Sequence, residues 1–334
     1  MVKKIKVGIS GVGGDVGQGV IKSLEASKFQ CDYYLLSSEI DSAWLYLYKN
    51  SFLSPRVTDP NYLKFIERFI SKFDIEVFIP TIDSEITLFA NASQDIEKKT
   101  GCKIFINSVE TVTITQDKWK TYKFLNDGGF FTPHTVIQDE AGLTKFRDRG
   151  LFPLISKPRS EAGSRNIKIV YNETQMRELT ADNKYILQDY LGDSLDELTC
   201  GVYLDDSYNV IGIAVLKRTL SNGSTKIAER LFLPQVEEQV AAVARGLRAK
   251  YLNIQGKYDG QELVIFELNG RLSGTVAMVS RIFNAPELFI SEKLHNEKLK
   301  KTNSLEAFIA IRFQDEIYTT SENVKDLILR SREL

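Results

Sequence analysis

Apolar and polar positions over the first hundred residues alternate between two patterns. Short apolar runs at 5–10, 33–37, 76–80 and 103–106 predict buried strands, and amphipathic segments at 16–27, 62–72 and 84–99 predict helices between them. Strands that alternate with helices of about ten to fifteen residues are typical of βαβ units around a parallel sheet. We therefore expect an α/β domain at the start of the chain.

The pattern changes after a helix predicted at 111–126, which a glycine pair at 128–129 would end. Short apolar runs then predict strands at 154–157, 167–170, 185–190, 197–204, 210–216, 254–258 and 263–268, with a helix at 235–248. The turns at 204–210 and 258–263 predict antiparallel hairpins. A strand or hairpin at 306–319 and a helix at 322–330 follow, so this part has an α+β pattern.

Composition narrows the class of protein. The 334 residues suggest two or three domains, and 43% hydrophobic with 26% charged residues is typical of a soluble globular protein. A net charge of −1 argues against nucleic acid as a partner, and no apolar run is long enough to cross a membrane. Three separated cysteines and no signal-peptide pattern predict a cytoplasmic protein. With two histidines, the chemistry is expected from carboxylates, amides, Lys and Arg.

The most informative motif ends the strand predicted at 263–268. Glu267, Asn269 and Arg271 occupy alternate positions, so their side chains would face the same space. A carboxylate beside an amide oxygen suits Mg²⁺, and a neighbouring guanidinium can bind phosphate through two donors. The alternative is a solvated strand end that carries only a salt bridge.

Two glycine-rich loops follow predicted strands. The first, at 8–17, lies between a strand and a helix, as in a dinucleotide-binding fingerprint, but a tight βα turn needs the same glycines without any nucleotide. The second, at 156–166, begins with Lys157, and its backbone N–H groups can cradle phosphate above that charge. Its alternative is an exposed basic hairpin.

A third element runs from 185 to 199. An apolar strand passes through a polar hinge into a second strand that begins at Glu197. Such a hinge can offer backbone donors and acceptors to an adenine edge, and the carboxylate can accept hydrogen bonds from ribose hydroxyls. Lys217 and Arg218 close a later strand, and Gln255 lies at the start of the hairpin that ends in Glu267.

The order and spacing of these elements resemble the ATP-grasp superfamily, specifically the branch similar to the large subunit of carbamoyl-phosphate synthetase. The resemblance implies a fold of class α/β plus α+β, with a Rossmann-like parallel-sheet (pre-ATP-grasp) domain at 1–110. A two-lobed ATP-grasp domain would follow at 111–300, with the small lid lobe within 111–190 and the metal- and phosphate-binding lobe at 191–300. Residues 301–334 would form a C-terminal strand and helix extension.

The resemblance also implies roles for individual residues. Nucleotide contacts would come from Lys118, Lys157, Ala162, Gly163, Ser164, Gln188, Asp189, Tyr190, Leu191 and Glu197. Metal ligands would be Gln255, Glu267 and Asn269, and the catalytic residues would be Arg271, Lys157 and Glu267. Asp189 stands where the family usually has Glu, and Gly270 replaces a proline of the family motif.

The activity that follows from the resemblance is ATP-dependent ligation. A carboxylate would be activated as an acyl phosphate and attacked by an amine or amino acid, forming a C–N bond and releasing ADP and phosphate. ATP and Mg²⁺ would be required, with Mn²⁺ as an alternative ion. We expect small-molecule partners, neither nucleic acid nor a membrane, and leave a homodimer open. Two alternatives are an NAD(P)-dependent oxidoreductase that uses the first glycine loop and an ATP-binding protein without turnover.

Five residues are candidates for substrate contacts. Asp83 and Glu85 follow the strand predicted at 76–80, where ligands often bind in open sheets, although a helix-capping role is an equal alternative. Lys217, Arg218 and Arg281 are candidates for binding a substrate carboxylate, with surface salt bridges as the alternative.

Overall fold

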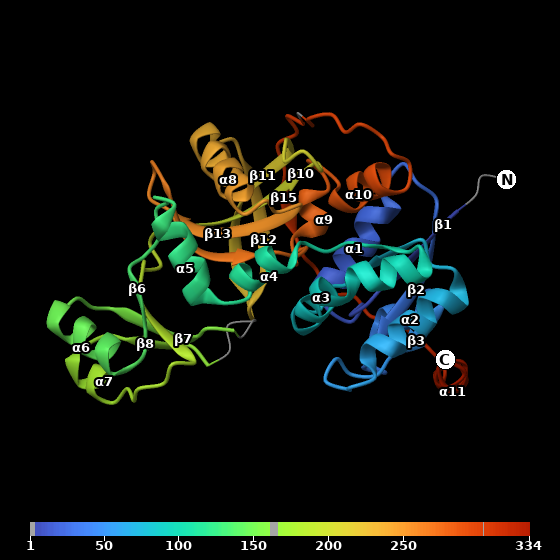
Figure 1. Cartoon of the computed structure of the whole chain (residues 1–334), viewed down its shortest axis with the longest axis horizontal. Helices are drawn as coiled ribbons and strands as arrows, with labels where there is room; N and C mark the ends of the chain where they lie inside the picture. Colours follow the sequence, from blue (N-terminus) through green and yellow to red (C-terminus); the bar gives the residue numbers. More distant parts are fainter. Residues whose placement is uncertain (1–3, 161–165, 303) are drawn as a thin grey trace.

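The computed structural model describes residues 4–160, 166–302 and 304–334 and arranges them around three β-sheets (Figure 1). The N-terminal sheet is parallel throughout the described residues, in the order β3-β2-β1-β4-β5. Its strands are β1 (Ile5–Ile9), β2 (Cys31–Ser37), β3 (Ser51–Leu53), β4 (Val77–Ile79) and β5 (Lys103–Ile104). The expected α/β domain is therefore present.

Helices cover both faces of this sheet. The apolar face of α1 (Asp15–Glu25) packs on one side, and α2 (Tyr62–Phe73) and α3 (Asp83–Thr100) pack on the other. A short 3-10 helix, η1 (Ala43–Tyr46), and strand β3 were not predicted from the sequence. Strand order reverses between β1 and β4, and ligands of open parallel sheets usually bind outside the strand ends at such a reversal.

The second sheet is antiparallel and has the order β14-β13-β10-β11-β12-β15 over the described residues. Its strands are β10 (Asp196–Leu204), β11 (Val210–Ser221), β12 (Ser224–Leu231), β13 (Tyr251–Tyr258), β14 (Leu263–Asn269) and β15 (Ile309–Ile311). Both predicted hairpins are confirmed, as β10–β11 and β13–β14. One face is covered by α8 (Pro234–Gly246), and the other packs towards α1, α9 (Val276–Val279) and α10 (Ala285–Lys293).

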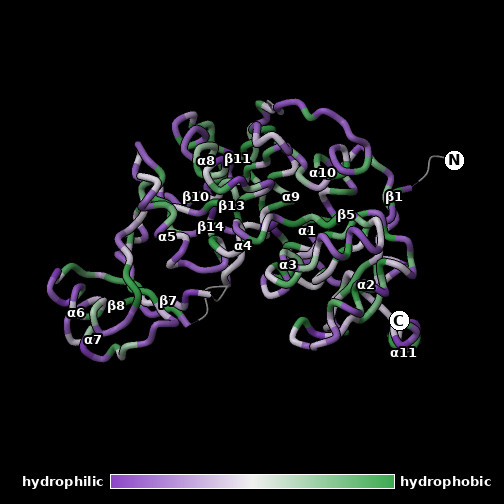
Figure 2. The backbone as a smooth tube through the Cα atoms, in the orientation of Figure 1, coloured by the Kyte–Doolittle hydropathy of each residue, from purple (hydrophilic) through white to green (hydrophobic). Residues whose placement is uncertain are grey.

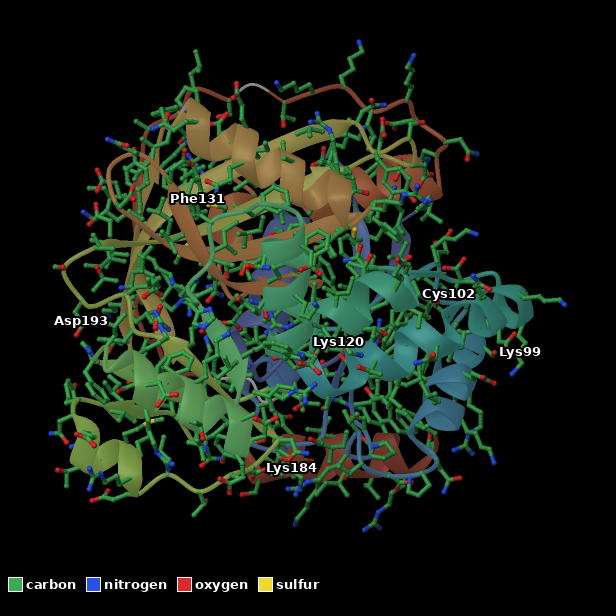
Figure 3. All side chains as sticks on the ribbon, turned by 60° about the vertical axis from the view of Figure 1, so that its left-hand side comes forward. Lys99, Cys102, Lys120, Phe131, Lys184 and Asp193 are labelled. Carbon is green, nitrogen blue, oxygen red and sulfur yellow. The ribbon has the colours of Figure 1, made fainter. Side chains whose placement is uncertain are left out.

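A smaller lobe lies at the lower left of Figure 1. Its sheet has the order β6-β9-β7-β8, with β6 (Thr135–Ile137), β7 (Leu154–Pro158), β8 (Lys168–Val170) and β9 (Tyr185–Asp189). Helices α6 (Glu140–Arg149) and α7 (Glu173–Arg177) belong to this lobe. Asp193, labelled in Figure 3, lies in the loop that leads from β9 back to β10 in the larger sheet.

The helix predicted at 111–126 is wrong as a single element. The chain forms α4 (Val109–Thr115) and α5 (Lys118–Asp127), separated at Asp117. The Asp117 carboxylate accepts hydrogen bonds from the backbone N–H of Trp119 at 2.9 Å and of Lys120 at 3.3 Å, which is N-cap geometry. The break makes Lys118 the first residue of α5.

The strands on one side of the second sheet also differ from the expectation. Strand β11 continues to Ser221 and pairs with β12, which the sequence pattern did not predict. Of the strand or hairpin predicted at 306–319, only β15 forms, paired with β12. Helix α11 (Ser321–Arg332) then returns to the N-terminal sheet, where Ser331 Oγ accepts a hydrogen bond from Leu53 N–H. Strands β12 and β15 carry few buried apolar residues, so the periodicity that marks a strand is weak in both.

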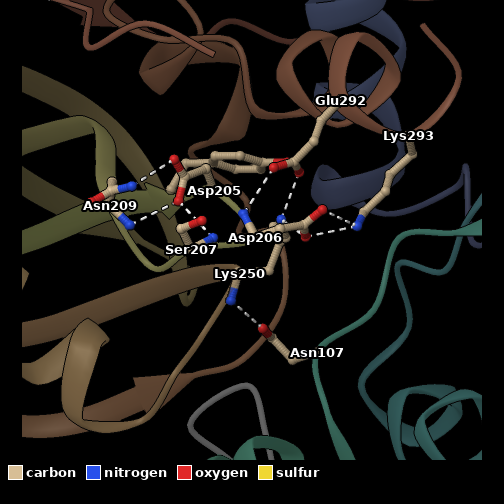
Figure 4. Close-up of polar contacts among 9 residues, drawn as sticks. Asn107, Asp205, Asp206, Ser207, Asn209, Lys250, Glu292 and Lys293 are labelled. Carbon is tan, nitrogen blue, oxygen red and sulfur yellow. Dashed lines mark hydrogen bonds and ion pairs between the residues drawn. The ribbon is translucent and has the colours of Figure 1, made fainter. Parts of the chain in front are cut away.

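A polar joint ties the two larger sheets together (Figure 4). Lys250, just before β13, pairs with Asp206 and Glu292, each at 2.5 Å, which links the β10–β11 turn to α10. Asn107, after β5, accepts a hydrogen bond from Lys250 N–H at 2.7 Å and donates one to the Gly270 carbonyl at 2.9 Å. The joint therefore fixes the chain next to Arg271.

Hydropathy follows this layering. In Figure 2 the apolar stretches lie mainly along the strands and inner helix faces, whereas the segment after α10 is hydrophilic. None of the helices within the described ranges has the length and apolar character needed to span a bilayer.

Candidate active site

A cavity of about 410 Å³ is lined by residues from all three parts of the fold. Twelve of the residues singled out from the sequence line it: Lys118, Lys157, Gln188, Asp189, Tyr190, Leu191, Glu197, Arg218, Gln255, Glu267, Asn269 and Arg271. Asp83, Glu85, Lys217 and Arg281 are not among its lining residues. Ala162, Gly163 and Ser164 lie outside the described residues.

The end of β14 has the geometry expected from alternation. Glu267 and Asn269 line the cavity together with Arg271, and Asn269 Nδ2 lies 3.4 Å from Glu267 Oε1. Gln255 is paired with Glu267 across the β13–β14 ladder. Phe266 is an extra residue in this ladder, because Glu267 pairs with Gln255 while Ile265 pairs with Gly256. This bulge adds the Phe266 ring to the cavity wall, which alternation alone does not predict.

Lys157, in β7, is a buried cation on the side of the cavity that the smaller lobe forms. It is 5% exposed, and its Nζ lies 5.5 Å from the centre of the Phe266 ring, within cation–π range. Burial lowers the pKa of Lys157 to about 8, with Glu267 opposing the shift and Lys118 adding to it. A lysine held in this way is poised to receive a negatively charged group.

A second set of contacts fixes the start of α5, where Lys118 lies, against the smaller lobe. Arg159, which follows β7, donates two hydrogen bonds to the Asp117 carboxylate, at 3.2 and 2.6 Å. Burial alone would raise the pKa of Asp117, but the hydrogen bonds and charge of Arg159 lower it. The Lys118 N–H also donates to the Arg159 carbonyl at 2.9 Å. The backbone of Lys118, the first residue of α5, is therefore anchored to the smaller lobe.

The hinge between β9 and β10 forms another wall. Gln188 is buried and donates from Nε2 to Thr135 Oγ1 at 2.8 Å. The Asp189 carboxylate accepts hydrogen bonds from both Nη atoms of Arg149, at 2.9 and 3.0 Å. Both side chains are thus held by residues of the smaller lobe.

Glu197 is surrounded by cations. Arg218 donates to Glu197 Oε1 at 2.9 and 2.7 Å and to Gln255 Oε1 at 2.9 Å, while Lys257 lies 3.2 Å from Glu197 Oε2. Arg218, considered from the sequence as a carboxylate anchor, thus lies with the candidate ribose acid. Lys257 was missed, although it is two residues from Gln255 and so faces the same side of β13.

The other substrate candidates are not among the residues that line the cavity. Asp83 forms a two-armed ion pair with Arg271, with an Nη2–Oδ2 distance of 2.7 Å, and so borders the cavity. Glu85 is fully buried and caps its own helix through the N–H groups of Thr81 and Ile82. Lys217 pairs with Asp196 at the surface, and Arg281 pairs with exposed Glu306.

The first glycine loop contributes its last residues to the cavity. Asp15 and Val16 line it opposite a loop of Ser273, Gly274 and Thr275. Packing accounts for the glycines: Gly11 has φ +60°, and a Cβ on Gly17 would lie 2.6 Å from the Gly11 carbonyl oxygen. Asp15 was missed from the sequence, where its position inside the glycine loop was the available signal.

The oxygen donors at the strand end fit Mg²⁺. Glu267 supplies a carboxylate, and Asn269 and Gln255 supply amide oxygens, which are hard ligands of the kind Mg²⁺ takes beside waters and phosphates. The Gln255 oxygen accepts one hydrogen bond from Arg218 in this structure, and its second lone pair is the one that such a set would use. Within the described part of the chain there is no cluster of three or more His, Cys, Asp or Glu with metal-binding geometry.

The arrangement of these sheets around the cavity defines an ATP-grasp fold preceded by a Rossmann-like domain. Residues 115–196 match the family model described as ATP-grasp domain. The N5-carboxyaminoimidazole synthetase from Staphylococcus aureus, solved with ADP, superposes with a TM-score of 0.71 and 14% identity, covering 93% of this chain and 83% of that one. The biotin carboxylase from Campylobacter jejuni, solved as a β,γ-ATP complex, superposes with a TM-score of 0.68 and 14% identity, covering 87% of this chain and 71% of that one.

The chain is also related in sequence to carbamoyl phosphate synthase large chains. It is 26% identical over 216 residues to the C-terminal section of that chain from Aquifex aeolicus, covering 59% of this chain and 40% of the relative. The large chain from Methanosarcina mazei is 23% identical over 237 residues, covering 63% and 21%. This chain therefore spans two fifths or less of the length of these relatives.

Proposed function

We propose that this protein is an ATP-dependent carboxylate–amine ligase that releases ADP and phosphate. The observation that carries the proposal is the convergence of Lys118, Lys157, Glu267, Asn269 and Arg271 on one cavity beside the hinge. Two lysines and an arginine suit a triphosphate, and the hinge backbone suits a nucleobase. Phosphoryl transfer depends on positioning and charge neutralisation rather than on histidine acid–base chemistry, which agrees with these side chains.

The proposed reaction has two steps. A carboxylate oxygen of the substrate attacks the γ-phosphorus of ATP, the bond to the β-phosphate oxygen breaks, and ADP leaves with that electron pair. The nitrogen of an amine then attacks the acyl carbon, the C–N bond forms, and inorganic phosphate departs with the electrons of the acyl C–O bond. The nitrogen gives up a proton to the phosphate or to solvent, so charge and atoms balance.

The protein's contribution is to hold and shield these groups. Lys118 and Lys157 bind phosphate oxygens, and Arg271 lies next to Asn269 where transferred charge would develop. Glu267, Asn269 and Gln255 would hold Mg²⁺, which neutralises phosphate charge when it is bound. Glu197, kept in place by Arg218 and Lys257, is the acceptor for ribose hydroxyls. The hinge at 188–191 receives the base.

The decisive experiment combines binding and turnover. Thermal-shift measurements should show stabilisation by Mg·ATP and none by NAD(P)H, because the glycine loop serves packing. ADP release should then appear with pools of carboxylates and amines, and Glu267→Ala should abolish it without lowering the folded fraction. Stabilisation by NAD(P)H alone would favour the oxidoreductase instead. Mg·ATP binding without ADP release from any pool would favour a non-catalytic ATP-binding protein.

A further inference from the structure

The side chain of Arg271 is held by the N-terminal domain. Its guanidinium donates from Nε and Nη2 to the two oxygens of the Asp83 carboxylate, with an Nη2–Oδ2 distance of 2.7 Å. Nη1 donates to the Leu272 carbonyl at 2.8 Å. The side chain of Arg271 is 13% exposed and that of Asp83 is 32% exposed, so the guanidinium is largely shielded from water. A two-point contact of this kind fixes the plane of the guanidinium as well as its position.

The backbone next to Arg271 is held from the same sheet edge. Asn107 follows β5 and donates from Nδ2 to the carbonyl of Gly270, the residue before Arg271, at 2.9 Å. Asp83 is the first residue of α3, which follows β4, and β4 and β5 are neighbouring parallel strands. The carboxyl ends of two adjacent strands therefore hold one arginine of the ATP-grasp domain, through its backbone and through its side chain.

The remaining donors of Arg271 suit a phosphoryl group. A guanidinium carries five N–H groups, and the contacts with Asp83 and Leu272 use three of them. One N–H stays on each of Nη1 and Nη2, and no residue in the described ranges accepts either one. Arg271 lines the cavity, whereas Asp83 is not among its lining residues. Asp83 can therefore affect a ligand in the cavity through the guanidinium that it holds.

We propose that Asp83 is a positioning residue for phosphoryl transfer, which holds Arg271 so that its two remaining N–H groups meet oxygens of the transferred group. The start of a helix stabilises a carboxylate, so Asp83 remains a charged acceptor there. An arginine that is fixed in advance does not have to reorganise when charge develops on the phosphoryl oxygens. The inference rests on the proposed ligase function, and it makes the N-terminal domain part of the phosphoryl-transfer site.

Two effects of Asp83 on phosphate recognition have opposite signs. As a negative charge, Asp83 weakens the attraction between Arg271 and a phosphate, so its removal would tighten phosphate binding if charge alone mattered. As a positioning residue, Asp83 orients the guanidinium, so its removal should weaken recognition of the transferred group. Asp83→Asn separates the two effects, because it keeps the size of the side chain and removes the charge and one acceptor oxygen.

The test uses the full chain and calorimetry with Mg·ADP, alone and with fluoroaluminate, which mimics a phosphoryl group in transfer. Fluoroaluminate should tighten the binding of Mg·ADP to the unaltered protein. Asp83→Asn should reduce that tightening about 10- to 100-fold and leave the affinity for Mg·ADP alone within about twofold. Asp83→Glu, which keeps the carboxylate, should restore part of the tightening. In an Arg271→Ala protein, adding Asp83→Asn should have no further effect, because Asp83 acts through Arg271.

Glu297→Gln is the matched control, because it is also an acid-to-amide change in an ion pair of the N-terminal domain. Glu297 pairs with Lys28 at 2.6 Å, which joins that domain to the segment after α10, and neither residue lines the cavity. This variant should keep the full tightening by fluoroaluminate. An equal loss in Glu297→Gln and Asp83→Asn would overturn the specific role of Asp83, since any contact of the N-terminal domain would then serve.

The other outcomes separate this inference from the proposed function. Undiminished or tighter fluoroaluminate binding by Asp83→Asn would overturn the positioning role. In ADP-release assays Asp83→Asn should lower kcat and leave the KM for ATP and for the amine unchanged. A raised KM for the amine with an unchanged kcat would instead place Asp83 in the amine site. If the unaltered protein does not bind Mg·ADP, or if fluoroaluminate does not tighten its binding, the ligase proposal is refuted, and this inference with it.

Discussion

Arg218 and Glu197 form a bidentate contact in which two guanidinium nitrogens, at 2.9 and 2.7 Å, donate to the same carboxylate oxygen. The side chains are 12% and 19% exposed, so each charge depends on the other. The third contact of Arg218, to Gln255 at 2.9 Å, joins the candidate ribose acid to a candidate metal ligand. The guanidinium therefore couples two halves of the cavity that the sequence presents as separate motifs.

We predict that Arg218→Gln raises the KM for ATP about tenfold and lowers the free energy of unfolding by about 2 kcal/mol, because Glu197 is left with Lys257 alone. Glu197→Gln should have a similar effect on KM. The double variant should be no worse than either single variant, since both remove the same interaction. Urea unfolding and ADP-release kinetics measure the two quantities. Additive losses would mean that the two side chains act independently.

The second prediction concerns pH and Lys157. Burial lowers its pKa to about 8 in the protein without nucleotide, so the ammonium is lost as the pH rises through that value. The phosphate groups of ATP bind the protonated form of Lys157, and bound phosphate raises the pKa of Lys157 again. The Kd for Mg·ATP should therefore be flat below about pH 8 and rise by up to about tenfold per pH unit above it.

Lys157→Arg separates this titration from others, because guanidinium stays protonated across the range. Calorimetry of this variant should give a Kd with a flatter response above about pH 8, even if its absolute affinity is lower. The same alkaline rise in both proteins would assign the titration to another group.

The third prediction distinguishes capping from substrate binding at Glu85. Its carboxylate is fully buried and accepts hydrogen bonds from Tyr62 at 2.5 Å, from Thr81 N–H at 2.6 Å and from Ile82 N–H at 2.8 Å, as well as from Ser10. Burial raises the pKa of Glu85, and these four donors oppose the shift. Glu85→Ala should cost about 3 kcal/mol of stability, since it leaves several buried donors unpaired.

Tyr62→Phe removes only one of these donors, so it should lower the free energy of unfolding by about 1 kcal/mol. Neither variant should change the KM for ATP or for the amine while the protein is folded, which steady-state kinetics below the unfolding temperature would measure. A stable Glu85→Ala protein with a raised KM for the amine would instead place Glu85 in the substrate site.

Local sequence patterns were sufficient to predict the layers of the fold. They were also sufficient to predict that Glu267, Asn269 and Arg271 share one face of their strand. A period of two in a strand fixes which side chains share a face, and the βα alternation fixes a parallel sheet, so both follow from neighbouring residues. The break at Asp117 was missed because a capping aspartate inside an apolar helical pattern is also compatible with a continuous helix. Its side-chain partner, Arg159, follows strand β7 and lies 42 residues later in the sequence.

The partners of the candidate site residues depend on tertiary structure. Glu197 gains Arg218 and Lys257 from two neighbouring strands, and Arg271 gains Asp83 from a helix 188 residues earlier. The periodicity of apolar residues within one strand or helix does not indicate such long-range partners. The bulge that places Phe266 under Lys157 depends on the register between two strands, which sequence alternation cannot specify by itself.

The fourth prediction explains why Gly270 stands before Arg271. Its backbone does not need a left-handed φ, but a Cβ at this position would lie 2.6 Å from Thr115 Oγ1. That hydroxyl is buried and donates to the Thr111 carbonyl at 3.0 Å, so it has little room to move. Gly270→Ala should therefore displace the chain next to Arg271, costing about 1–3 kcal/mol of stability and lowering kcat for ADP release.

Thr115→Ala tests this explanation, because it removes the atom that the new Cβ would meet. Alone it should cost about 1 kcal/mol through the lost hydrogen bond. Combined with Gly270→Ala it should restore kcat and most of the stability, giving a favourable coupling in a double-mutant cycle of urea midpoints and ADP-release rates. If the double variant is as inactive as Gly270→Ala, the glycine matters through the Asn107 hydrogen bond to its carbonyl rather than through the space beside Thr115.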